Sequence, residues 1–136
     1  MNPQKGFTLI ELLIVITVIG ILATMIVPNL SAAQDKAKEA SVKSIMHTLQ
    51  IAIESYNIDS GTYPTGSNLS VEDIYLVLIE DDYLKKIPIN PFTKANYSSS
   101  DTAGQVYYTF DESTNNYYLK GYGRKPEKTL LELTNT

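Results

Sequence analysis

The chain has 136 residues, a formal net charge of −4 at pH 7 and no cysteine. This length allows one modest domain, and the lack of cysteine excludes a disulfide framework, a thiolate zinc site and a cysteine nucleophile. Charges of both signs are scattered along the chain without a basic run, so nucleic acid is not indicated as a partner.

The first element along the chain is an apolar segment of membrane length. From Phe7 to Leu30 the sequence is almost entirely apolar, and as a helix it extends roughly 36 Å, enough to cross a bilayer core. The rival interpretation is a cleaved secretory signal, whose shorter apolar region ends in a small-residue site such as residues 31–33. The length of the run favours a transmembrane helix. Lys5, the one charge before it, weakly favours a cytoplasmic amino end and an exported remainder.

One carboxylate, Glu11, interrupts the apolar segment near its start. A charge inside a membrane costs a few kcal/mol or more, so it is either tolerated near the headgroups or paired with a positive group. The candidate partner is a new amino terminus, formed by cleavage after Gly6, on the Phe7 of a neighbouring subunit. This hypothesis explains the short leader, the glycine and the carboxylate together.

The stretch GFTLIELLIV, from Gly6 to Val15, resembles the class III signal of type IV pilins and type II secretion pseudopilins. The resemblance implies that a prepilin peptidase cuts between Gly6 and Phe7 and methylates the Phe7 amine. It also implies that the subunit waits in inner membrane lipid until an assembly platform and its ATPase move it into a helical filament. Glu11 would there neutralise the amino terminus of an adjacent subunit.

Two further residues of the apolar segment predict an irregular helix. Pro28 has no N–H and its ring crowds the carbonyl of Thr24, so a kink is expected there. Gly20 weakens the helix slightly. The resemblance implies that the stretch between Gly20 and Pro28 can unwind in a filament, so we expect a helix kink or a melted segment there.

Beyond Pro28 the pattern becomes amphipathic, and one long helix is predicted from about Thr8 to Asp59. Packing against the protein's own head is favoured for Ile45 to Tyr56, and contacts with other subunits for Leu30 to Ala40. The repeating residues are Leu30, Ala33, Ala37, Ala40, Ile45, Leu49, Ala52 and Tyr56.

The residues after the long helix predict a second, short helix. Asp59-Ser60-Gly61 ends the first helix, because glycine readily takes the left-handed conformation. Residues 70–73 resemble a capping box, and the apolar run that follows predicts a helix to about Tyr83. The acidic run 80–82 is read as the solvated end of this helix; pairing with lysines of a neighbouring subunit is the alternative.

The last third of the chain is predicted to be β structure. Residues 105–110 and 117–122 are rich in aromatic and branched side chains and flank a turn cluster, which predicts an antiparallel hairpin. Residues 129–133 supply a third strand, and 96–104 form a surface loop. The 10 tyrosines suit a half-buried sheet better than an adhesive stripe along a filament.

Two later segments, GTYPT at 61–65 and DDYLKKIPINPF at 81–92, are similar to features of major pseudopilins. Some pseudopilins bind calcium in an acidic loop, but the corresponding region, 121–128, is basic and offers only Glu127 as a carboxylate. The acidic residues at 111–116 are better explained as a hairpin turn, and His47 is a lone histidine. No metal, cofactor or catalytic residue is therefore expected.

The predicted fold is α+β, a pilin-like lollipop in which a long amino-terminal helix packs on a small antiparallel sheet with one short extra helix. The expected divisions are a leader at 1–6, a transmembrane and polymerisation half-helix at 7–30, an amphipathic half-helix at 31–60 and a globular head at 61–136.

The favoured function is a structural one, a pilin subunit that forms homo-oligomeric helical filaments of a surface type IV pilus for adhesion, motility or DNA uptake. The alternative is the major pseudopilin of a type II secretion system, which forms a periplasmic pseudopilus. The GTYPT and YLKKIP segments favour the alternative, and the basic loop at 121–128 argues against it. A remote third hypothesis is a membrane-anchored enzyme or binding protein, but the sequence offers no nucleophile–base pair or phosphate loop.

Overall fold

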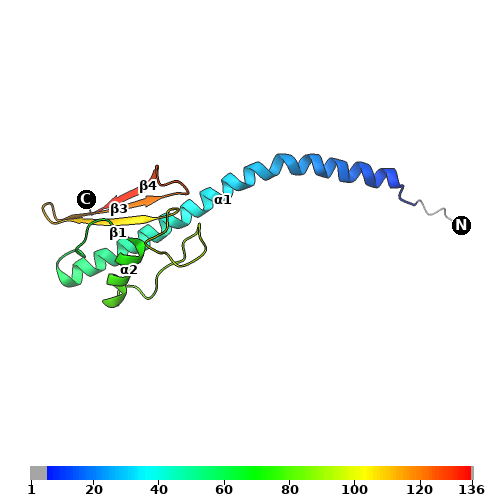
Figure 1. Ribbon diagram of the computed structural model, residues 1–136. Helices are drawn as coiled ribbons and strands as arrows, with labels where there is room; N and C mark the ends of the chain where they lie inside the picture. The colour runs from blue at the N-terminus through cyan, green and yellow to red at the C-terminus, as the bar shows by residue number, and fades with distance from the viewer. Residues whose placement is uncertain (1–5, 136) are drawn as a thin grey trace. The chain divides into compact units, whose positions relative to one another are not determined.

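The computed structural model describes residues 6–135, the side chains of residues 27–29 excepted, and has an α+β fold as predicted (Figure 1). Within that range it contains two α-helices and one four-stranded antiparallel sheet. The elements in chain order are α1 (Leu9–Ser60), β1 (Leu69–Ser70), α2 (Val71–Glu80), β2 (Val106–Asp111), β3 (Asn116–Tyr122) and β4 (Thr129–Thr134).

The chain divides into two compact units, with the boundary inside α1. The amino-terminal segment, described here from residue 6, ends at Gln34, and the head begins at Asp35 and contains every other element. One helix, α1, therefore contributes residues to both units.

The long helix lies within one residue of its predicted limits, and in the head it buries one stripe of side chains. Val42, Met46, Leu49 and Ile53 are fully buried at spacings of four, three and four, as expected for the inner face of a helix. The prediction that Ile45 to Tyr56 packs against the head is confirmed, with Ile45 and Tyr56 at the edge of the core. The alanines at 33, 37 and 40 are exposed, and their contacts with other subunits remain a prediction. At the end of α1, Gly61 takes a φ of 76° and its N–H donates to the Asn57 carbonyl at 2.9 Å.

The second helix begins where the capping box predicts and ends three residues early. The Asp73 N–H donates to Ser70 Oγ at 3.3 Å, and the Ser70 N–H donates to Asp73 Oδ2 at 3.2 Å. The predicted extension to Tyr83 is wrong because Asp82 takes a left-handed φ of 62°. The Tyr83 N–H then donates to the Leu78 carbonyl at 2.9 Å, which closes the last turn.

The sheet has the order β1-β2-β3-β4, and every neighbouring pair is antiparallel. The predicted hairpin is confirmed, with Val106 opposite Gly121 and Asp111 opposite Asn116. The predicted third strand is confirmed as β4, an edge strand that pairs with β3. β1 was not expected, because a two-residue strand leaves no alternating pattern in the sequence.

The buried tyrosines line the sheet and keep their hydroxyl groups hydrogen-bonded. Tyr108 Oη donates to the Pro64 carbonyl at 2.7 Å, and Tyr117 Oη donates to Glu54 Oε1 of α1 at 2.7 Å. Burial raises the pKa of both phenols above its ordinary value. The 96–104 loop is less exposed than expected, because Tyr97 is only 2% exposed and donates to the Gly104 carbonyl at 2.6 Å.

Candidate functional site

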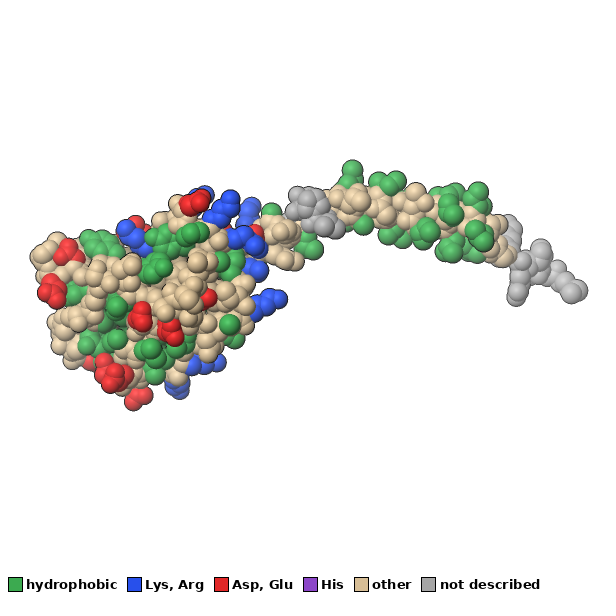
Figure 2. Space-filling view, viewed as in Figure 1, with side chains coloured by type: hydrophobic (Ala, Val, Ile, Leu, Met, Phe, Trp, Pro, Cys, Tyr) green, Lys and Arg blue, Asp and Glu red, His purple; other side chains and the backbone are tan. Residues whose placement is uncertain are grey.

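The amino-terminal segment presents an apolar surface that its own chain does not cover. Among the described residues, Leu9–Ile26 of α1 is the one helical stretch long and apolar enough to cross a membrane, and none of it is buried. Figure 2 shows apolar side chains around this part of the helix. Water disfavours such a surface, which suits a helix that is surrounded by lipid or by protein.

The predicted cleavage junction lies just before this helix and is open. Residues 6–8 are not helical, and the Phe7 side chain is 83% exposed. A Cβ added to Gly6 would meet no atom within 4 Å. The rest of the predicted leader, residues 1–5, lies outside the described part of the chain. Cleavage between Gly6 and Phe7 and methylation of Phe7 remain predictions.

Glu11 has a structural partner that the sequence analysis missed. The backbone N–H and the hydroxyl of Thr8 both donate to Glu11 Oε2, at 2.8 and 2.7 Å, and the Glu11 N–H donates to Thr8 Oγ1 at 3.3 Å. This is a capping box, and its Thr-x-x-Glu signature was readable in front of the apolar run. Oε1 accepts no hydrogen bond from any described residue, so it is available to a neighbour. Pairing with the amino terminus of another subunit remains a prediction.

Polar backbone and side-chain groups within the apolar helix are satisfied locally. The hydroxyl of Thr17 donates to the Leu13 carbonyl and that of Thr24 to the Ile21 carbonyl, both at 2.7 Å. Such internal pairing suits a helix surrounded by hydrocarbon. α1 is helical through Gly20 and Pro28, and the Pro28 side chain lies outside the described part. A kink or a melted segment within a filament remains a prediction.

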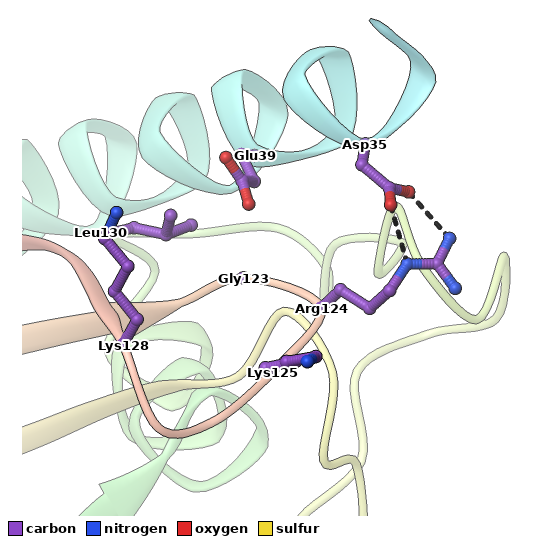
Figure 3. Close-up of a pocket in the computed structure, with 7 residues that line it drawn as sticks. All are labelled: Asp35, Glu39, Gly123, Arg124, Lys125, Lys128 and Leu130. Carbon is purple, nitrogen blue, oxygen red and sulfur yellow. Dashed lines mark hydrogen bonds and ion pairs between the residues drawn. The ribbon is translucent and has the colours of Figure 1, made fainter. Parts of the chain in front are cut away.

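At the start of the head, an ion pair ties the β3–β4 loop to α1. Arg124 Nε donates to Asp35 Oδ2 at 2.8 Å and Arg124 Nη2 to Oδ1 at 2.6 Å, a bidentate arrangement (Figure 3). These hydrogen bonds hold the pKa of the Asp35 carboxyl below its ordinary value and raise that of Arg124. No local sequence pattern indicates this contact, because 89 positions separate the two residues.

The same loop and helix enclose a hollow of about 280 Å³, which is referred to below as the basic hollow. Its lining residues are Asp35, Glu39, Gly123, Arg124, Lys125, Lys128 and Leu130. A second hollow of about 220 Å³ lies on the outer face of the sheet, lined by Asn68, Tyr107, Thr109, Tyr118, Lys120 and Tyr122. Within residues 6–135, no group of three or more His, Cys, Asp or Glu side chains is placed to hold a metal ion.

The acidic positions considered for a cation instead form the turn of the hairpin. Asp111 Oδ1 accepts hydrogen bonds from the Ser113 N–H at 3.0 Å and its hydroxyl at 2.6 Å. The hydroxyls and N–H groups of Ser113 and Thr114 lower the pKa of Asp111. Asn115 takes a left-handed φ of 55°, which a tight turn requires. This confirms the hairpin-turn interpretation.

Comparison with known proteins supports the resemblance from two directions. Residues 1–27 match the model of the prokaryotic N-terminal methylation motif. The chain is 35% identical over 99 residues to the type II secretion system core protein G of Klebsiella michiganensis, covering 67% of this chain and 70% of that one. It is 35% identical over 99 residues to the protein of the same name from Escherichia coli K12, covering 67% and 68%.

A more divergent relative gives the same result. The core protein G of Pseudomonas aeruginosa is 31% identical over 104 residues, which cover 67% of this chain and 70% of that one. No solved structure matches the chain. The motif, the exposed apolar helix and these relatives together show that the chain belongs to the pilin and pseudopilin family.

Proposed function

We propose that the chain is the major pseudopilin of a type II secretion system. It is a structural subunit, processed between Gly6 and Phe7, that polymerises through its amino-terminal segment into a periplasmic pseudopilus. The observation that carries this proposal is the similarity to proteins named type II secretion system core protein G over two thirds of the chain. The surface type IV pilus favoured by the sequence analysis has support only at the level of the family, from the methylation motif.

The exposed apolar helix supports polymerisation as the working principle. In the inner membrane, lipid covers Leu9–Ile26; in a homo-oligomeric helical filament, the same surface is covered by the helices of other copies. Both environments are apolar, so moving a subunit between them gains little hydrophobic free energy. The energy for extraction therefore comes from outside the subunit, from an assembly platform and its ATPase.

This proposal assigns the chain no enzymatic activity and no cofactor. The remote alternative, a membrane-anchored enzyme, requires a pocket of convergent polar groups with a nucleophile or base. The two described hollows are lined by carboxylates, basic side chains, tyrosines and one threonine, without serine, cysteine or histidine, and no arrangement of a nucleophile beside a base is seen in them. The head then serves to space and orient subunits in the filament.

The direct test is deletion of the coding sequence in the source organism, with two readouts on one strain. The amount of exported protein in the culture medium reports secretion, and electron microscopy of the cell surface reports pili. We expect exported enzymes to accumulate in the periplasm while surface pili persist, and a plasmid copy of the wild-type chain to restore secretion. Loss of surface pili with normal secretion would instead identify a type IV pilin.

A further inference from the structure

The charges of the head are divided between its two ends. Most basic side chains gather at the end where α1 enters the head, whereas acidic side chains are frequent at the opposite end (Figure 2). The entry end carries Lys36, Lys38, Arg124, Lys125 and Lys128, with Asp35, Glu39 and Glu127 among them. The opposite end carries Asp59, Glu80, Asp81 and Asp82, where Asp59 Oδ2 accepts a hydrogen bond from Tyr83 Oη at 3.0 Å.

The basic end follows the apolar span closely along one helix. Lys36 lies ten positions after Ile26, a rise of about 15 Å along α1. The hydrocarbon core of a bilayer is about 30 Å thick and the headgroup layers add about 5–8 Å on each side. With the apolar segment in a membrane, lysine side chains of this length therefore reach the headgroup layer.

This position is unusual for lysines if the head is exported. Lysine and arginine near a span normally favour the cytoplasmic side. Here Lys36 and Lys38 follow the span, and Lys5 alone precedes it. Anionic headgroups on the exported side would stabilise lysine side chains that lie close to the surface.

The basic hollow contains charged groups that the fold itself does not pair. Arg124 is engaged by Asp35, whereas Lys125 and Lys128 form no ion pair with any described residue. Both lysines are exposed, and Figure 3 shows them on the loop that faces Glu39 across the hollow. Glu39 likewise has no hydrogen bond or ion pair to a described residue.

These groups match the parts of a phospholipid headgroup that carries net negative charge. Two lysine ammonium groups suit the phosphodiester of an anionic lipid, whose headgroup carries no amine to neutralise the phosphate charge. The Glu39 carboxylate is placed to accept a hydroxyl, such as those of a glycerol headgroup, and Leu130 adds an apolar wall. A free phosphate would engage the lysines but leave Glu39 facing a like charge.

We propose that the basic hollow binds the headgroup of an anionic phospholipid and holds the head against the exported face of the inner membrane before assembly. The proposal rests on the membrane-inserted stage of the proposed function and on nothing about secretion. The competing occupant is the acidic end of a second copy, which the same lysines would also attract. We favour lipid because Asp35 and Glu39, which line the hollow, follow the apolar span within a few helical turns along the chain.

The test uses the full chain in detergent micelles supplied with phosphatidylglycerol, phosphatidylcholine or phosphatidylethanolamine at equal concentrations. Native mass spectrometry counts the lipids retained on each protein. We expect phosphatidylglycerol to be retained at least threefold more than either zwitterionic lipid, with the preference weakened by salt. The double variant Lys125→Gln/Lys128→Gln should lose this preference.

The matched control is Lys85→Gln/Lys86→Gln, which removes the same charge from two exposed lysines after α2. It should keep the wild-type preference, and circular dichroism should show that both variants remain folded. Equal retention of all three lipids would overturn the proposal, as would an equal loss in both double variants. Inorganic phosphate that displaces the lipid at micromolar concentration would show a soluble ligand instead.

The competing outcome is that the wild-type chain shows no lipid preference and forms dimers in low salt that the Lys125→Gln/Lys128→Gln variant does not form. This result would assign the hollow to a second copy and overturn the lipid proposal. Because lipid retention is measured on purified protein, its failure is independent of the secretion test. If the deletion strain secretes normally but the purified chain prefers the anionic lipid, the assignment of the hollow still holds and only the proposed function is contradicted.

Discussion

The two parts of α1 are one helix by hydrogen bonding but have opposite relations to the rest of the chain. In the amino-terminal segment, Leu22 is 54% exposed and belongs to a unit in which α1 is the one described helix or strand. In the head, Leu49 is 0% exposed and packs in the core with residues of α2 and the sheet. Both are leucines in a helix, so composition alone does not decide burial.

This contrast indicates which surroundings stabilise the amino-terminal segment of α1 and which stabilise the part of α1 in the head. The second part of α1 is held by its own head through buried side chains at helical spacing. The first part exposes its apolar side chains, and under the proposed function lipid or other subunits cover them. Substitutions in the first part should therefore change membrane residence and assembly, and substitutions in the second should change folding.

The largest effect is expected from Glu11→Gln. Glutamine at this position preserves the capping box with Thr8 but removes the charge. If Glu11 pairs with the amino terminus of a neighbour, pseudopili should be almost absent in electron micrographs of cells that overproduce the chain. The thermal unfolding of the head should be unchanged.

Thr8→Val is the matched control for this variant, because it removes the capping hydroxyl and keeps the charge. It should assemble at close to the wild-type level. The opposite pattern, with normal assembly of Glu11→Gln and failure of Thr8→Val, would show that Glu11 acts only as a helix cap.

A pair of leucine substitutions addresses the contrast within α1. Leu49→Ala removes a fully buried side chain, and the lost packing should lower the free energy of unfolding of the head by about 2–5 kcal/mol. Leu22→Ala should leave that free energy unchanged, because Leu22 is 54% exposed and lies outside the compact unit that forms the head. Urea unfolding of both variants in detergent, followed by tyrosine fluorescence, measures the two values. Equal destabilisation would mean that the two parts fold as one unit.

Two glycines give a subtler version of the same contrast. A Cβ at Gly121 of β3 would overlap Met46 of α1, which is itself fully buried, so Gly121→Ala should destabilise the head by about 1–3 kcal/mol. At Gly20 no atom lies within 4 Å of an added Cβ, and alanine is the better helix former. Gly20→Ala should therefore leave head stability unchanged in calorimetry. A lower head stability in Gly20→Ala would contradict the claim that the amino-terminal segment does not contribute to the stability of the head.

The smallest effect concerns pH and the Asp35–Arg124 ion pair. Because the folded pKa of Asp35 lies below its unfolded value of about 3.9, the pair stabilises the head above that pH. The contribution is lost as the pH falls through the folded pKa. At pH 7, Asp35→Asn should lower the melting temperature by about a few degrees at most, since the pair is partly exposed. The difference from wild type should shrink as the pH falls through the folded pKa of Asp35, and a constant difference would contradict the assignment.

Elements with a local signature could be predicted from the sequence, and contacts between distant segments could not. The capping box at Ser70 and the left-handed Gly61 fixed two helix boundaries, because caps depend on neighbouring residues. The end of α2 was missed because Asp82, rather than a glycine, takes the left-handed conformation. On α1, the predicted stripe included the buried Leu49 but omitted Val42, Met46 and Ile53, which are fully buried beside it.

The candidate site divides in the same way. Cleavage after Gly6 and the assembly role of Glu11 stay predictions, but both could be formulated from the sequence because they lie in one local motif. The basic hollow was not, because Asp35 and Lys128 come from elements that meet only once the sheet forms. The contact between Thr8 and Glu11 could have been predicted from the capping-box signature. It was missed because Glu11 was considered only as a charge inside an apolar segment and not as part of a helix cap.

The most direct test of the account is the intact mass and amino-terminal sequence of the chain in three fractions: washed membranes, periplasm and material sheared from cells. The account predicts a chain that begins at methylated Phe7 in the membrane and periplasmic fractions and is scarce in the sheared material. Abundant processed chain in the sheared fraction would point to a surface pilus. A chain that retains Met1, or that is cut near Ala33, in every fraction would contradict assembly through the amino-terminal segment.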